Sequence, residues 1–117
     1  MAINAKKFAT AVEIDQNTLA GTVITATNGG QSRVFTELTI TNTSTTLALT
    51  VSVFVLDTAD LPIDVTLYNA AKVIQPGKVW NVLADLGGLT MSPSQSLVAF
   101  PLVDNIGRCS AGGYEQT

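Results

Sequence analysis

The stretch that decides the fold is LTITNTSTTLALTVSVFVLD, Leu38 to Asp57, in which only the final residue is charged. Its length alone suggests a membrane-spanning helix. Of the nineteen residues from Leu38 to Leu56, however, only ten are apolar and six are threonine. A spanning helix needs about 20 predominantly apolar residues. The composition therefore argues against a membrane segment.

The spacing of the apolar residues in this stretch is that of β-strands. Leu38 and Ile40 alternate with threonines, and a polar break follows at residues 42–46. Beyond the break every second residue is apolar, namely Leu47, Leu49, Val51, Val53 and Val55. A period of two with many β-branched residues is typical of strands. The stretch is predicted to form two strands joined by a polar turn.

The same pattern extends along the chain, and no window shows helical spacing. The predicted strands are Ala11–Asp15, Leu19–Thr27, Arg33–Thr41, Thr46–Leu56, Val65–Ile74, Val79–Leu83, Gln95–Phe100 and Ile106–Tyr114. Between two of them, Gln75-Pro76-Gly77-Lys78 has the proline and glycine of a type II turn at its centre. About eight short strands with turns between them predict an all-β protein, a single antiparallel sandwich of jelly-roll or immunoglobulin-like type.

The length and composition favour one domain that buries part of its surface against other subunits. The chain has 117 residues, which suits a single domain. Residues 1–10 are expected to form an extended N-terminal arm with Phe8 as its anchor, and residues 11–117 the sandwich. Charged residues make up 13% of the chain, where about 25% is usual. So little charge favours an assembly in which subunits cover one another.

The charge pattern excludes nucleic acid as a partner, and the N-terminus shows no export signal. The six basic residues are scattered, whereas a nucleic-acid-binding surface needs a basic stripe. The start, MAINAKKFATAVEID, lacks the apolar core and small-residue cleavage site of a secretory signal. The glycosylation sequon Asn42-Thr43-Ser44 is therefore expected to have no role.

The residues needed for most catalytic chemistry are missing. The chain has no histidine, which removes the commonest general base, nucleophile partner and metal ligand. Glu13 and Asp15 share a strand face and could act as a pair, but solvated surface charges are the simpler interpretation. A lysine base at Lys72 or Lys78 is conceivable, although Lys78 falls in a turn. We expect no enzyme and no cofactor.

A calcium site and a disulfide are the two remaining chemical alternatives. Asp57, Asp60 and Asp64 could offer oxygen ligands, but their spacing matches no standard calcium loop, so a plain acidic loop is favoured. Cys109 is the only cysteine. A buried reduced thiol is the favoured interpretation, with an intermolecular bridge as the alternative.

Four aromatic residues bear on binding. Trp80 shares its parity with Val82, which favours a core position over a sugar-stacking platform. Phe35 and Phe54 fall on the polar parity of their strands. An exposed aromatic side chain at such a position can belong to a contact surface. Together with Phe8, they are the candidate protein-interface residues.

The order of segments resembles that of small β-sandwich virion proteins of tailed bacteriophages. The resemblance begins with TLAGTVITATNGGQSRVFTELTITNTSTTLALTVSVFV, a threonine-rich strand, a strand ending in an Asn-Thr-Ser turn and a valine-rich strand. It continues with KVIQPGKVWNVLADLGGLTMSPSQSLVAF and ends with GRCSAGGYEQ. The likeness is one of pattern over most of the chain, and no catalytic motif is part of it.

The resemblance implies a non-enzymatic structural protein of the virion, made in the host cytoplasm. Such proteins serve as capsid decoration or cement proteins, which favours a location on the capsid surface, or as parts of the neck, collar or tail. The implied partners are the major capsid protein or other virion proteins and further copies of the chain, often as trimers, with no nucleic acid and no membrane. A carbohydrate-binding or adhesion module is the alternative of another class, because β-sandwiches host such sites often.

Overall fold

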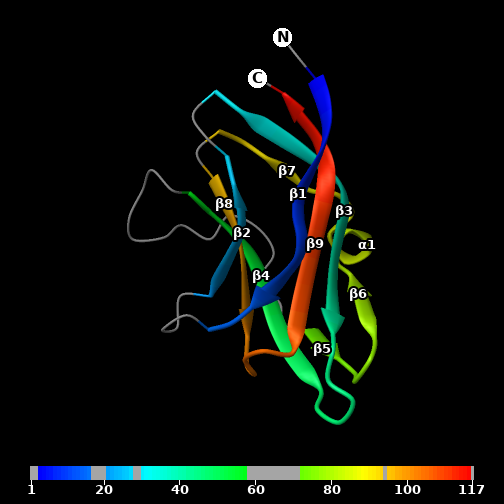
Figure 1. The fold of residues 1–117 in the computed structure, drawn as a ribbon. Coiled ribbons are helices and arrows are strands. Elements are labelled where there is room, and N and C mark those ends of the chain that lie inside the picture. The colour runs from blue at the N-terminus through cyan, green and yellow to red at the C-terminus, as the bar shows by residue number, and fades with distance from the viewer. Residues whose placement is uncertain (1–2, 17–20, 28–29, 58–71, 94, 117) are drawn as a thin grey trace.

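The computed structural model describes residues 3–16, 21–27, 30–57, 72–93 and 95–116, which form a sandwich of two antiparallel sheets (Figure 1). The elements are β1 (Ile3–Ile14), β2 (Thr22–Ala26), β3 (Ser32–Asn42), β4 (Leu49–Asp57), β5 (Lys72–Ile74), β6 (Val79–Asn81), α1 (Val82–Leu86), β7 (Thr90–Met91), β8 (Gln95–Pro101) and β9 (Gly107–Gln116). The all-β sandwich is thus confirmed, with nine strands in the described part of the chain.

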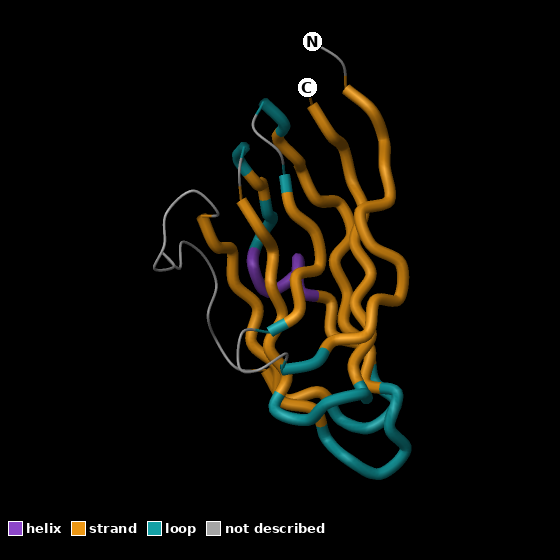
Figure 2. Tube along the Cα trace, turned by 60° about the vertical axis from the view of Figure 1, so that its left-hand side comes forward, coloured by secondary structure: helices purple, strands orange, loops and turns teal. Residues whose placement is uncertain are grey.

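The strand order is that of a jelly roll. One sheet has the order β1-β9-β3-β6, with β7 also paired to β3, and the other has the order β2-β8-β4-β5. In an immunoglobulin sandwich the first two strands share a sheet, whereas here β1 and β2 lie in different sheets. The four-stranded path of the first sheet and the four strands of the second, connected by such crossings, make the double Greek key of a jelly roll, with β7 as an addition to the first sheet. Figure 2 shows the strands and, among the described residues, the single short helix.

The core between the sheets is made by the alternation that the sequence shows. Eight inward-facing side chains are at most 3% exposed: Leu38, Ile40, Leu49, Val51, Val53, Val55, Leu97 and Ala99. Burying a valine or leucine side chain contributes about 1.5–3 kcal/mol relative to leaving it in water. Leu47 is an exception to the prediction, since β4 begins only at Leu49 and Leu47 is 52% exposed.

Asn42 ties the two sheets together at the end of β3. Its side-chain amide donates to the carbonyl oxygens of Leu47 (2.8 Å) and Ile74 (2.9 Å). Its Oδ1 accepts the backbone N–H of Ser44 at 2.9 Å. The residue is completely buried. Since both polar atoms of the amide have hydrogen-bond partners, the free-energy cost of removing them from water is small. The sequon at Asn42 is therefore inaccessible in the folded chain.

The segment expected to be an arm is part of the sheet. β1 is hydrogen-bonded to β9 from the Ile3–Gln116 pair to the Ile14–Gly107 pair, and no boundary falls at residue 10. The register shifts twice along β1, and Ala11 has a positive φ of 45°. These irregularities let Ala9 reach the core. Residues 3–10 are extended, as expected, but they belong to the domain.

The strand predicted from Val79 to Leu83 is wrong beyond Asn81. There the chain turns into α1, whose first turn is capped by the Asn81 side chain accepting from the N–H of Ala84 at 3.4 Å. Gly87 ends the helix in the left-handed conformation (φ 74°). An asparagine cap and a terminal glycine are strong helix boundary signals, but the helix between them is too short to show a period. The type II turn before β6 is confirmed, with Lys78 N–H donating to Gln75 O at 3.1 Å.

Candidate functional site

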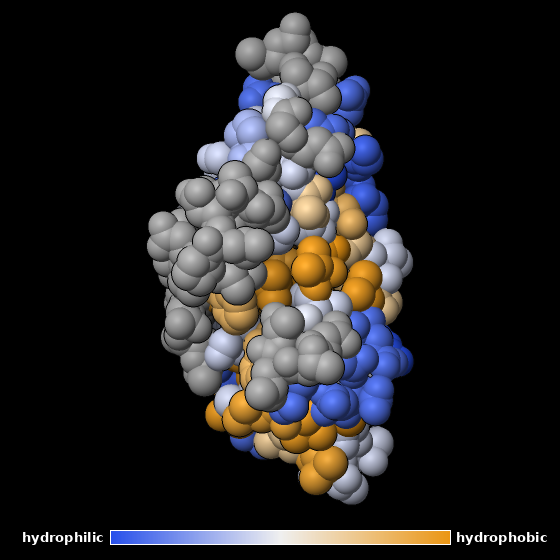
Figure 3. Space-filling model, turned by 90° about the vertical axis from the view of Figure 1, so that its left-hand side faces the viewer, coloured by the Kyte–Doolittle hydropathy of each residue, from blue (hydrophilic) through white to orange (hydrophobic). Residues whose placement is uncertain are grey.

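The outer face of the β2–β8–β4–β5 sheet carries no charge on the outward-pointing side chains that the structure describes. We call it the uncharged face and define it by Val23, Ala26, Thr50, Ser52, Phe54, Val73, Ser96, Val98 and Phe100, which alternate with the core residues of the same strands. Figure 3 views the molecule from the side of this sheet and shows hydrophobic atoms gathered near its middle. Val23 and Val73 are exposed, Phe54 and Phe100 are partly exposed, and Val98 and Ser96 are buried. Exposed apolar side chains that gather on one face mark contact sites in proteins.

The strand register places the apolar residues of the uncharged face side by side. Phe54 lies opposite Val98, and Val98 lies opposite Val23 on its other side. Phe100 is opposite Ser52, two residues along each strand, at the next pair that points outward. At the two edges of the sheet, Val23 is 56% and Val73 is 53% exposed. The row is thus apolar, and solvent reaches it at the two edges, whereas Val98 at its centre is only 1% exposed.

The outer face of the other sheet is different, and we call it the charged face. Arg108 Nη1 and Glu13 Oε2, on directly paired positions of β9 and β1, are 2.6 Å apart. Lys7 and Glu37 join across Gly112, with 2.7 Å between Nζ and Oε1. All four side chains are about 36–53% exposed. The charges of this face lie in ion pairs that solvent reaches.

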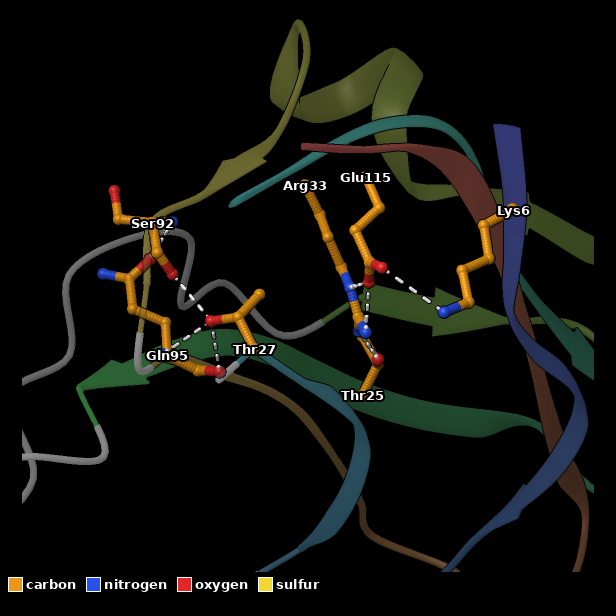
Figure 4. Close-up of polar contacts among 7 residues, drawn as sticks. All are labelled: Lys6, Thr25, Thr27, Arg33, Ser92, Gln95 and Glu115. Carbon is orange, nitrogen blue, oxygen red and sulfur yellow. Dashed lines mark hydrogen bonds and ion pairs between the residues drawn. The ribbon is translucent and has the colours of Figure 1, made fainter. Parts of the chain in front are cut away.

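A third set of charges lies between the sheets, near the chain ends (Figure 4). Glu115 of β9 is 7% exposed and accepts from Arg33 Nε (3.0 Å) and Nη2 (2.9 Å) and from Lys6 Nζ (3.3 Å). Arg33 also donates to the hydroxyl of Thr25 in the opposite sheet, and its guanidinium stacks 4.7 Å from the ring centre of Phe8.

This cluster is built to hold the sheets together and not to move protons. The hydrogen bond from Arg33 holds the pKa of Glu115 below its ordinary value, and Lys6 adds to the effect against desolvation. A carboxylate held ionised by partners on two strands is a poor general acid or base near neutral pH.

A neighbouring set of uncharged groups fastens β2 to the turn before β8. The Thr27 hydroxyl donates to Ser92 O at 2.7 Å and accepts the backbone N–H of Gln95 at 2.9 Å (Figure 4). The Gln95 side chain in turn accepts from Ser92 N–H at 2.8 Å. These side chains form their hydrogen bonds with one another and with the backbone of the turn. The set therefore stabilises the local structure, and we do not consider it a ligand site.

A cleft of about 390 Å³ opens at one side of the sandwich, where β5 and β6 are the last strands of the two sheets. Trp80 lies beneath it, 5% exposed, and its indole N–H donates to Asp85 Oδ2 at 2.7 Å. Lys72 Nζ is 3.3 Å from the same oxygen. The hydrogen bonds from Trp80 and Lys72 hold the pKa of Asp85 below its ordinary value. Because Trp80 is buried, its ring face is not available to stack on a sugar.

The three aromatic residues proposed for an interface have separate positions. Phe8 and Phe35 contact each other edge to face, with ring centres 5.0 Å apart. Phe35 is 4% exposed and belongs to the core, so its assignment to a polar strand face is wrong. The reason is a β-bulge between Phe35 and Glu37, which reverses the parity of β3 and turns Val34 outward instead. Phe54 does lie on an outer face, partly exposed.

The close approach of the strands on both sides of β9 explains the glycines at positions 112 and 113. A Cβ at Gly113 would lie 2.0 Å from the carbonyl oxygen of Val34, directly beside the bulge. At Gly112 it would meet the carbonyl oxygen of Lys6 at 3.3 Å. β9 therefore needs glycine here so that β1 and β3 can both approach closely.

The other candidate chemical groups are accounted for by local structure. Glu13 is paired with Arg108, and Asp15 Oδ1 accepts the backbone N–H of Asn105 at 3.0 Å. Cys109 is 1% exposed, and burial raises its pKa to about 12. Such a thiol is an unreactive core residue, as favoured from the sequence.

The proposed calcium ligands fall mostly outside the described residues. This is so for Asp60 and Asp64 and for the side chain of Asp57. Among the residues that the structure describes, no group of three or more histidine, cysteine, aspartate or glutamate side chains could hold a metal ion. None of the helical structure in the described ranges has the length and apolar character needed to cross a membrane.

Comparisons with protein-family models, with curated proteins and with solved structures gave no match. The candidate sites therefore rest on the geometry of this chain. Of them, the uncharged face has residues from all four strands of its sheet.

Proposed function

We propose that this protein is a non-enzymatic structural protein of a phage virion, and specifically a capsid decoration or cement protein. In this proposal the uncharged face is the surface that packs against the shell. Its partners are the major capsid protein and further copies of the chain, with a trimer favoured. Bound copies that bridge shell subunits stabilise the assembled state by mass action, because they bind that state and not the separated subunits.

The observation that carries the proposal is the uneven distribution of charge over the two outer faces. An interface core is depleted of charged residues and enriched in aromatic ones. The uncharged face has that composition, with Phe54 and Phe100 among its residues. The charged face, with its solvated ion pairs, has the composition of an ordinary protein surface.

The fold adds independent support of a weaker kind. Jelly rolls recur in viral capsid domains, although they also occur in lectins, and a fold alone does not decide a function. The lectin alternative has less support from the site, since Trp80 is buried under the cleft. A position in the neck, collar or tail uses the same packing face and differs in copy number.

Quantitative mass spectrometry of purified particles tests the proposal. The amount of this chain is compared with that of the most abundant shell protein. A ratio of the same order as the shell protein is expected for decoration. A ratio far below it would assign the protein to the neck or tail. Absence from the particle would refute the virion proposal.

A further inference from the structure

The cleft beside β5 and β6 is a concave feature that shares only Val73 with the uncharged face. It lies inside the arch formed by β5, the turn from Gln75 to Lys78, and β6, which carries the chain from one sheet to the other. Its volume of about 390 Å³ falls in the range of ordinary ligand sites.

The cleft holds the one basic side chain that has no acidic partner in the described part of the chain. The other five basic residues are all in ion pairs, namely Lys6 and Arg33 with Glu115, Lys7 with Glu37, Lys72 with Asp85, and Arg108 with Glu13. Lys78 lines the cleft and is exposed. A chain with a net charge of −3 thus presents its unpaired positive charge at this cleft.

The other residues that line the cleft determine which ligand could bind beside Lys78. Lys72 has two further N–H donors besides the one directed to Asp85, since an ammonium carries three. Asp85 is already engaged by Trp80 and Lys72. Val73, the middle residue of β5, and Val79, the first residue of β6, also line the cleft and are 53% and 59% exposed. The cleft therefore combines ammonium donors with apolar side chains at its rim.

We infer that this cleft binds an extended, acidic peptide segment of a neighbouring protein, with a carboxylate on Lys78 and Lys72. The inference rests on the proposed function, because it names the chemistry of one partner segment in the assembly. Lysines act as point charges toward carboxylates. The two strand edges also allow an extended chain to lie alongside them.

The test uses the isolated, isotopically labelled protein and two short capped peptides. In one, aspartate alternates with valine, and in the matched peptide asparagine replaces aspartate. The indole N–H of Trp80, which is the only tryptophan, gives a single resolved NMR signal directly below the cleft. Aspartate peptide at about 1 mM is expected to shift this signal and the amides of Lys72 and Lys78. The asparagine peptide is expected to shift them less.

Variants separate the cleft from general charge effects. Lys78→Ala is expected to weaken binding of the aspartate peptide about threefold to tenfold. Lys7→Ala, which removes an equal charge from the charged face, is expected to leave binding unchanged. Equal shifts with both peptides, shifts confined to other surfaces, or an unaffected Lys78→Ala variant would each overturn the inference. None of these results depends on particle composition, so failure here leaves the proposed function standing, and its failure is seen separately by mass spectrometry.

Discussion

The two outer faces of this sandwich are both formed by antiparallel strands, yet one carries charged side chains and the other carries none among the residues that define it. On the charged face, Glu13 pairs with Arg108 and Lys7 with Glu37 across neighbouring strands. On the uncharged face, the equivalent cross-strand positions hold Phe54 opposite Val98 and Ser52 opposite Phe100. The low charge content of the chain is therefore a property of one face and not of the whole surface.

This difference in charge indicates which of the two faces is suited to remain exposed to solvent. Exposed ion pairs contribute little to stability, about 0–1 kcal/mol each, so the charged face is explained by solubility. Exposed valine occurs on both faces, since Val34 and Val79 are exposed on the charged face as Val23 and Val73 are on the uncharged face. The two faces therefore differ in charge, and a protein partner can cover the uncharged face without burying ion pairs.

Adding charge to the uncharged face should have the largest effect. The double variant Val23→Lys and Val73→Lys should keep its fold, because both side chains are more than half exposed. Burying two unpaired ammonium groups in an interface should lower the affinity for purified shells by about 100-fold or more. Co-sedimentation with shells stripped of this protein measures it.

The matched control carries the same substitution on the other side of the sandwich. Val34 is 43% exposed and points outward from β3 on the charged face. Val34→Lys should bind shells as the wild type does. Equal loss of binding in both variants would contradict the assignment of the contact surface to one face.

Gly21→Ala should give the largest loss of stability among conservative changes near the uncharged face. Gly21 has a φ of +82°, and an added Cβ would lie 2.8 Å from Val98 Cγ1 and 2.9 Å from the carbonyl oxygen of Ala99. Strain and overpacking together should cost about 2–4 kcal/mol of unfolding free energy. Gly77→Ala has a similar φ of +73° with nothing within 4 Å, so it should cost about 1–2 kcal/mol. Urea denaturation measures both, and equal losses would refute the close packing on Val98.

Glu115→Gln should make the stability of the protein less dependent on acid. The folded-state pKa of Glu115 lies below its ordinary value of 4.5, chiefly through the hydrogen bond from Arg33. Its contribution is therefore complete above that pH and is lost as the pH falls through the lower, folded-state pKa. The variant should be less stable than wild type near neutral pH, and the gap should narrow on acidification below pH 4.5. A gap that stays constant with pH in denaturant titrations would contradict the role of the ionised carboxylate.

Lys7→Ala should have the smallest effect. Lys7 and Glu37 are both about half exposed on the charged face, so the loss should be about 0–1 kcal/mol and should vanish at high salt. Thermal unfolding at low and high ionic strength measures it. A large, salt-independent loss would mean that the charged face is a structural part of the fold, and the contrast between the faces would then weaken.

The sequence predicted the parts of the fold that depend on local alternation. Leu38 and Ile40 and the valines of β4 are in the core as their period of two requires. The prediction failed where one inserted residue reversed the parity, as at the bulge after Phe35. It also failed at α1, a helix of five residues, which is shorter than the window in which a helical period can be seen.

The candidate sites depend on long-range pairing and were therefore hidden. Lys6 and Glu115 are 109 positions apart in the chain, and Arg33 joins them only because β1, β9 and β3 are neighbours in one sheet. Phe54 could be assigned to an outer face from parity alone. That the same face also holds Val23, Val73 and Phe100 follows from the strand order, which the sequence left open between two kinds of sandwich.

The orientation of the sandwich on the assembled particle tests the central claim most directly. A cryo-electron microscopy reconstruction of the purified particle, at a resolution that separates the two sheets, would show it. We expect the uncharged face, with Val23, Phe54 and Val73, to lie against a neighbouring subunit and the ion pairs of the charged face to point into solvent. The reverse orientation, with Glu13–Arg108 and Lys7–Glu37 buried and the uncharged face in water, would contradict the account.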